Sequence, residues 1–267
     1  MERRTWTSKD SALYALAVGA SGLDNATELA YSTEDLGADG QRVLPSFAAV
    51  VGRRTADAWD GLGDLDKRGL VHGEQALRLY APLPAAGTVD VQSKVLEVLD
   101  KRTGTLIRTR TTGFGRGGKA LFEADSGTFL RGVTGIGDAQ GAASEPWSLP
   151  ERDPDVNMRQ HTHPEQALLY RLTGDMNPLH ADPEVARRAG FPGPILHGLC
   201  TYGFACRAVV AQLESGGGKL NGMSARFSAP VYPGDALITR IWLDGNDVTF
   251  VVDDDDGRRV LDRGRAW

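Results

Sequence analysis

The sequence predicts an α+β fold made of two similar halves. Each half holds an apolar helix candidate, 44–59 in the first and 196–213 in the second, followed by strand-length segments that turns separate. Matching points of the two halves lie about 150 residues apart, a spacing that suits a duplicated domain rather than a solenoid repeat. The expected architecture is therefore a long central helix wrapped by an antiparallel sheet, formed twice.

The first half, residues 1–131, opens with a short amphipathic segment that contains Leu13 and Leu16. Its helix candidate follows, and the loop 56–69 after it has no period that predicts a structure. Val, Ile, Thr and Phe are frequent in the chain after this loop, as is typical of strands. Strands are expected at 70–83, 89–99, 106–114 and 120–130.

Residues 132–157 are rich in Gly, Ala, Pro and acidic residues and show no apolar period, which predicts a linker. The second half, 158–267, repeats the amphipathic segment at Leu169 and Leu172. Its helix candidate is apolar nearly all round, which predicts that it is buried. Strands are expected at 224–231, 236–243, 248–253 and 258–262.

Composition excludes several classes of function. The net charge of -5 and the pI near 5.6 give no electrostatic reason to expect nucleic acid or an anionic membrane as a partner. Two cysteines, Cys200 and Cys206, cannot form a disulfide framework or a four-thiolate zinc site, and they are expected to pack inside a helix. No apolar run is long enough for a membrane span, so a cytoplasmic location is expected.

The segment GDMNPLH, residues 174–180, carries the chemistry. Asp175 and His180 would point well over a right angle apart on a regular helix, so they converge only where the chain turns. Pro178 provides that break, and the side chains of Asp175 and Asn177 can bond nearby backbone to hold a turn. Asp182 then reads as the N-cap of a short helix over 183–189, which fixes the far end of the loop.

The start of the buried helix is a second candidate site. His197 and Gly198 lie where its backbone N–H groups are unpaired and its dipole is positive, an environment suited to an oxygen that gains negative charge. Because Gly198 has no side chain, a ligand can approach its N–H closely.

Together with ARFSAPVYPGD and LVHGEQALRLYAPLP, the segment GDMNPLHADPEVARRAGFPGPILHGLCTYG closely resembles the MaoC-like (R)-specific 2-enoyl-CoA hydratases of the hydratase 2 family. The resemblance covers nearly the whole chain. It implies a double hot-dog fold in which the second half is catalytic and the first half, which lacks the D-x-N-P-x-H signature, accommodates the acyl chain.

The resemblance also implies the activity, namely hydration of trans-2-enoyl-CoA to (3R)-3-hydroxyacyl-CoA, or the reverse, in fatty-acid or sterol side-chain β-oxidation. Asp175 and His180 are the implied catalytic pair, Asn177 is a candidate for orienting the water, and the N–H of Gly198 is the implied contact for the thioester oxygen. The division of acid and base work between Asp175 and His180 stays open. No cofactor and no metal are expected, because the coenzyme A thioester is the substrate.

Several other residues have ordinary structural interpretations beside functional ones. Four histidines are expected to be structural or exposed rather than catalytic or metal-binding: His72, His161, His163 and His197. The phosphates of coenzyme A need cationic partners, for which the weak candidates are Arg187, Arg188, Arg226 and Arg240.

The sequence alone leaves other functions open. They are a dehydratase acting on carrier-protein thioesters, a hot-dog thioesterase, and a non-catalytic subunit that binds acyl thioesters. The acyl group itself is not readable from the residues. A homodimer is expected, because the resemblance implies dimers, although an internal duplication already covers one sheet edge.

Overall fold

The structure is a computed structural model that describes residues 1–21, 26–34, 40–65, 70–138 and 147–267. Parts of two segments considered above lie outside the described residues: 66–69 of the loop 56–69, and 139–146 of the predicted linker.

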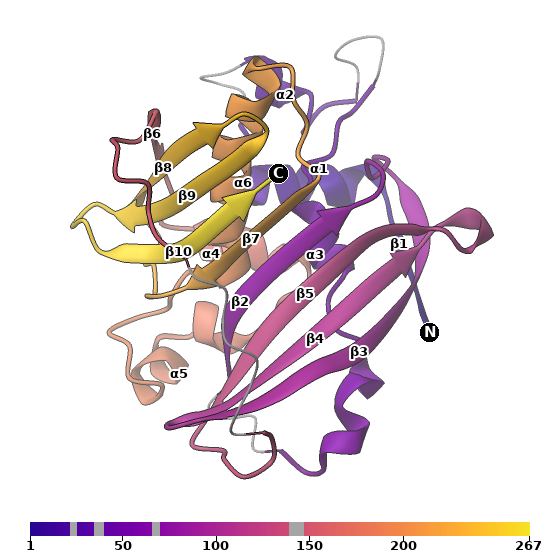
Figure 1. Cartoon of the computed structure of the whole chain (residues 1–267), viewed down its shortest axis with the longest axis vertical. Coiled ribbons are helices and arrows are strands. Elements are labelled where there is room, and N and C mark those ends of the chain that lie inside the picture. The colour runs from indigo at the N-terminus through magenta and orange to yellow at the C-terminus, as the bar shows by residue number, and fades with distance from the viewer. Residues whose placement is uncertain (22–25, 35–39, 66–69, 139–146) are drawn as a thin grey trace.

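The strands of the described part form one antiparallel sheet (Figure 1). Those of the first half are β1 (Glu2–Trp6), β2 (Leu70–Leu79), β3 (Gly87–Lys101), β4 (Gly104–Phe114) and β5 (Ala120–Arg131). Those of the second half are β6 (Val156–His161), β7 (Gly222–Phe227), β8 (Ala236–Asp244), β9 (Asp247–Asp254) and β10 (Arg259–Ala266). The order across the sheet is β1-β3-β4-β5-β2-β7-β10-β9-β8-β6.

The two halves join through strands β2 and β7, which pair from Glu74 opposite Arg226 to Arg78 opposite Gly222. All eight strands predicted from the sequence are present, with ends shifted by up to four residues. Strands β1 and β6 were not predicted, because each is a short edge strand with little apolar alternation. Strand β6 begins at Val156, inside the predicted linker.

Helix α6 (Gly198–Ser215) is the central helix of the second half and begins two residues after the predicted start. Eleven of its residues are buried, as its all-round apolar sequence predicts. The Tyr202 hydroxyl donates to the carbonyl of Met223 at 2.7 Å, which ties the helix to β7. Gly203 lets Tyr14 and Val18 of the first half approach closely, since a Cβ there would overlap Val18.

The predicted long helix over 44–59 is wrong. Only α3 (Phe47–Val51) forms, and a 3₁₀ segment, η1 (Ala56–Leu62), follows after extended chain at Thr55. Gly52 is the C-cap of α3 and lies where a side chain would overlap Phe122 and Ala124 of β5. The segment η1 instead covers a separate apolar cluster around Trp59. The two halves are therefore not equivalent, because the described residues of the first half form no helix as long as α6.

The remaining helices lie behind and around the sheet in Figure 1, with residues 26–29 above it and residues 183–188 below it. They are α1 (Ser8–Ala17), α2 (Ala26–Leu29), η2 (Arg116–Gly118), α4 (Gln166–Tyr170), η3 (Arg171–Thr173), η4 (Pro178–His180) and α5 (Pro183–Arg188). Within the described ranges, no helix combines the length and apolar character needed to cross a membrane.

Candidate active site

The candidate catalytic loop, residues 174–182, folds as its sequence predicts. The carboxylate of Asp175 accepts a hydrogen bond from the N–H of Asn177 at 3.2 Å. The side-chain oxygen of Asn177 accepts one from the N–H of Leu179 at 3.0 Å and so caps the single turn η4, with Pro178 at its first position. The amide nitrogen of the Asn177 side chain stays available as a donor.

Helix α5 closes the far end of this loop. The Asp182 carboxylate accepts from the N–H of Glu184 at 2.8 Å and from that of Val185 at 3.4 Å, as expected for an N-cap. The helix covers 183–188, one residue shorter than predicted, and Gly190 follows with a positive φ of 88°.

The imidazole of His180 has a defined tautomer. Its Nδ1 lies 2.8 Å from the carbonyl oxygen of Ile195, which can only accept, so Nδ1 carries the hydrogen and Nε2 is a free acceptor. Burial lowers the pKa of His180 below its usual 6.5, against the opposing effects of this hydrogen bond and of Asp175. A neutral ring with a free Nε2 can accept a proton.

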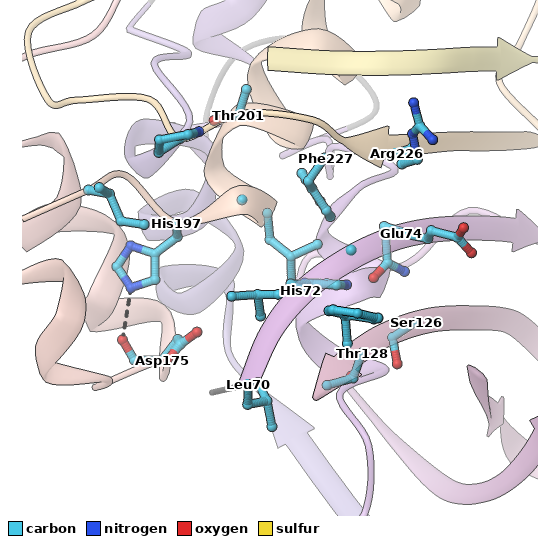
Figure 2. Close-up of a pocket in the computed structure, with 18 of the residues that line it drawn as sticks. Leu70, His72, Glu74, Ser126, Thr128, Asp175, His197, Thr201, Arg226 and Phe227 are labelled. Atoms are coloured by element: carbon cyan, nitrogen blue, oxygen red, sulfur yellow. Dashed lines mark hydrogen bonds between the residues drawn. The ribbon is translucent and has the colours of Figure 1, made fainter. Parts of the chain in front are cut away.

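His197 is buried, as expected of a structural histidine, yet it belongs to the same cluster. Its ring stacks on that of His180, with centroids 3.7 Å apart and an interplanar angle of 27°. Its Nε2 donates to the main-chain carbonyl of Asp175 at 3.1 Å (Figure 2). Burial, and secondly the neighbouring His180, lowers the pKa of His197 to about 4.

A cavity of about 630 Å³ opens between the halves and brings the predicted catalytic residues together. Asp175, Asn177, His180 and Gly198 all line it. Gly198 is the first residue of α6, and a Cβ there would lie 3.1 Å from the ring of Phe227. The helix start therefore offers its N–H groups to the cavity only because this position has no side chain.

The first half contributes part of the cavity wall. His72 of β2 lies against the Phe227 ring, with centroids 4.8 Å apart, and Figure 2 shows it with Thr128 and Ser126 in the same wall. Burial lowers the pKa of His72 to about 4. Sequence reasoning treated His72 as structural, because a lone histidine in a strand carries no local signal of a cavity.

The four candidate arginines for coenzyme A are placed differently. Arg226 lines the cavity but is paired with Asp262 at 2.6 Å. The other three, Arg187, Arg188 and Arg240, do not line it. Sequence reasoning missed the basic residues of the first half that do: Arg53, Arg54, Lys101 and Arg131. Of these, Lys101 and Arg131 are brought together only by the β3–β4 and β4–β5 pairings, which no sequence spacing reveals.

Asp175, His180 and His197 offer possible metal-ligand atoms within 4.8 Å of one another. The two rings are nearly parallel, so their in-plane lone pairs do not converge as they do around a tetrahedral metal ion. The cluster therefore fits proton transfer better than metal binding. Cys200 and Cys206 are free thiols buried on α6, and burial raises the pKa of both, consistent with packing residues.

Comparisons with known proteins agree with this arrangement. Residues 5–132 match the MFE-2 hydratase 2 N-terminal domain, and residues 147–259 match the MaoC like domain. The chain is 43% identical over 242 residues to 3-hydroxyacyl-thioester dehydratase Y of Mycobacterium tuberculosis, covering 89% of this chain and 82% of the relative. It is 37% identical over 270 residues to the peroxisomal enoyl-CoA hydratase 2 of Arabidopsis thaliana, covering 93% and 85%.

Solved structures show the same fold. A MaoC-like dehydratase from Phytophthora capsici superposes with a TM-score of 0.86 at 31% identity, covering 99% of this chain and 92% of that one. A Mycobacterium tuberculosis protein described as having a double hot-dog fold superposes with a TM-score of 0.58 at 17% identity, covering 99% and 92%. The fold and the site thus define a double hot-dog hydro-lyase. The chain belongs to the MaoC-like hydratase 2 family.

Proposed function

We propose that this protein adds water reversibly to trans-2-enoyl-CoA and forms (3R)-3-hydroxyacyl-CoA. The observation that carries the proposal is the convergence of Asp175, the free Nε2 of His180 and the first N–H of α6, at Gly198, on one cavity. A base, an acid and an oxyanion donor are the groups that this reaction needs.

The geometry suggests how each group acts. The Asp175 carboxylate and His180 Nε2 hold a water beside C3 of the substrate, and one of them takes a proton as the oxygen bonds to C3. The electron pair of the double bond moves toward the thioester, whose oxygen gains negative charge beside the N–H of Gly198. C2 then receives a proton from the same pair of side chains. We leave the division of the two transfers between Asp175 and His180 open.

Several finer assignments belong to the proposal. The (3R) configuration is supported by membership of the family. We assign the acyl chain to the first half, residues 1–131, because apolar side chains of that half, among them Leu70, Leu106 and Phe129, line the cavity. We assign the coenzyme A phosphates to Lys101 and Arg131, two exposed cations on the cavity wall. Service in fatty-acid or sterol side-chain β-oxidation and a cytoplasmic location complete the proposal.

Hydration of a panel of trans-2-enoyl-CoA thioesters, followed by the loss of the conjugated absorbance, tests the function. Chiral analysis of the product should give the (3R) acid, and chelators should leave the rate unchanged. Release of free coenzyme A would instead indicate a thioesterase. Binding without turnover would indicate a non-catalytic subunit, and faster dehydration of a carrier-protein thioester would favour the carrier-protein reaction.

A further inference from the structure

Two consecutive main-chain carbonyls of the candidate catalytic loop accept hydrogen bonds from different halves of the chain. The carbonyl of Gly174 accepts a hydrogen bond from Arg53 Nη1 at 2.6 Å. The next carbonyl, that of Asp175, accepts the 3.1 Å hydrogen bond from His197 Nε2. Arg53 comes from the first half, directly after α3, whereas His197 is the N-cap residue of α6. The two halves therefore meet on the backbone that carries the catalytic carboxylate.

Side-chain packing contributes little to the position of residues 174–176. Met176, the residue after Asp175, is 55% exposed. The Asp175 carboxylate bonds Asn177 inside the loop itself, and the carbonyl of Met176 has only a long contact of 3.5 Å with Arg171. The shortest hydrogen bond that residues 174–176 receive from outside the loop is therefore the one from Arg53, whose guanidinium is a charged donor.

Arg53 is itself fixed in place. The Arg4 guanidinium of β1 donates to the carbonyl of Arg53 at 2.5 Å and to that of Val51 at 2.6 Å. The Arg53 guanidinium can lie this close because Gly174 has no side chain: a Cβ there would be 2.9 Å from Nη2. The φ of Gly174, 116°, also favours glycine. The glycine before the catalytic aspartate thus has a defined role in this contact.

His197 acts on both members of the catalytic pair. The same ring that donates to the Asp175 carbonyl stacks on His180 at 3.7 Å. Asp175, His180, Tyr170 and Arg171 surround the ring, and its Nε2 bonds the main-chain carbonyl of Asp175. A shift of the His197 ring would therefore change the separation of Asp175 and His180.

We propose that Arg53 and His197 are positioning residues that together hold Asp175 at the distance from His180 that the reaction needs. The inference rests on the proposed hydratase function and deepens it. The half without the catalytic signature then contributes Arg53 to the active site, and the site is complete only when both halves are folded together.

The test separates the donor from the rest of each side chain. Arg53→Met keeps the length without the donor, and Arg53→Lys keeps a cationic donor. His197→Phe keeps the stacked ring without the donor, and His197→Gln keeps a donor without the ring. The matched control is Arg159→Met, because Arg159 is an exposed arginine outside the cavity that pairs with Asp255.

We expect Arg53→Met and His197→Phe each to lower kcat about ten- to a hundredfold, because small displacements of a catalytic group have effects of that size, with KM nearly constant. Arg53→Lys and His197→Gln should recover part of the loss. The double variant Arg53→Met, His197→Phe should lose less than the product of the single effects, because both contacts hold one segment. Arg159→Met should behave as the wild type.

Hydrogen exchange read by mass spectrometry gives a measure that does not depend on activity. In Arg53→Met and His197→Phe, amides of residues 174–180 should exchange faster while α6 and the sheet keep their protection. A raised KM with unchanged kcat in Arg53→Met would show instead that Arg53 binds substrate phosphate and would overturn the proposal. So would unchanged loop exchange together with unchanged kcat. Absence of hydration by the wild type would refute the proposed function alone, since the exchange result still tests the two contacts.

Discussion

The carbonyl of Ile195 lies 2.8 Å from Nδ1 of His180, fifteen residues earlier in the chain, and this contact decides which nitrogen of the catalytic imidazole is free. Without it, either ring nitrogen could carry the hydrogen. With it, Nε2 is left as the acceptor in the cavity that Asp175 also lines.

The first prediction concerns this pair. Replacing Asp175 with Asn or His180 with Gln should lower turnover by about two to four powers of ten, the usual contribution of a positioned acid or base. Both changes are nearly isosteric, so thermal unfolding should shift little. Steady-state hydration and calorimetry check both points, with His163→Gln, outside the cavity, as the control. A folded variant with most of its turnover would refute the assignment.

The pH dependence of activity follows from the buried imidazole. Because burial lowers the pKa of His180, the ring stays neutral at pH values where an exposed histidine is protonated. For hydration, we expect kcat/KM to keep its value as the pH falls through 6.5 and to decline only at lower pH. A rate profile from pH 4 to 8 measures this. An acidic limb centred above 6.5 would contradict it.

Stability should also depend on pH. His72 and His197 each have a pKa near 4 in the folded protein, whereas an unfolded chain binds these protons near pH 6.5. The unfolded state therefore holds more protons between these values, and stability falls as the pH drops from 6.5 toward 4. Thermal melts across this window should show the decline. His72→Phe, which keeps a ring against Phe227, should show a shallower decline, and an identical slope would count against the buried neutral His72.

Gly198 can be tested by adding one methyl group. In Gly198→Ala the new Cβ would lie 3.1 Å from the Phe227 ring. It would also lie beside the N–H that we propose as the donor to the thioester oxygen. We expect kcat/KM to fall about a hundredfold or more, the usual effect of losing an oxyanion donor. Gly216→Ala, at the other end of α6 where contacts are ordinary, is the control and should keep its activity. Equal activity of the two variants would remove Gly198 from the site.

We also predict a homodimer. Sedimentation at micromolar concentration should give about twice the chain mass of 28.6 kDa. The edge strands β1 and β6 leave backbone groups that a second copy could pair. A monomer would refute the predicted homodimer. Full activity of that monomer would also show that one chain holds a complete active site.

Local geometry in the loop 174–182 and in the second half follows from residues that are near one another in the sequence. Pro178, the side chains of Asp175 and Asn177, and the Asp182 cap act on backbone within a few residues, so their effect can be read from spacing. The same holds for α6, whose apolar surface predicts burial whatever its neighbours are.

The surroundings of that loop depend instead on contacts between distant parts of the chain. The helix that begins at Phe47 ends at Gly52, which packs against β5, and Arg53 directly after it reaches a carbonyl 121 residues away. The stack of His197 on His180 and the entry of His72 into the cavity depend in the same way on elements far apart in sequence. Such contacts leave no periodicity in the chain, because they are selected by the packing of the two halves rather than by local backbone preference.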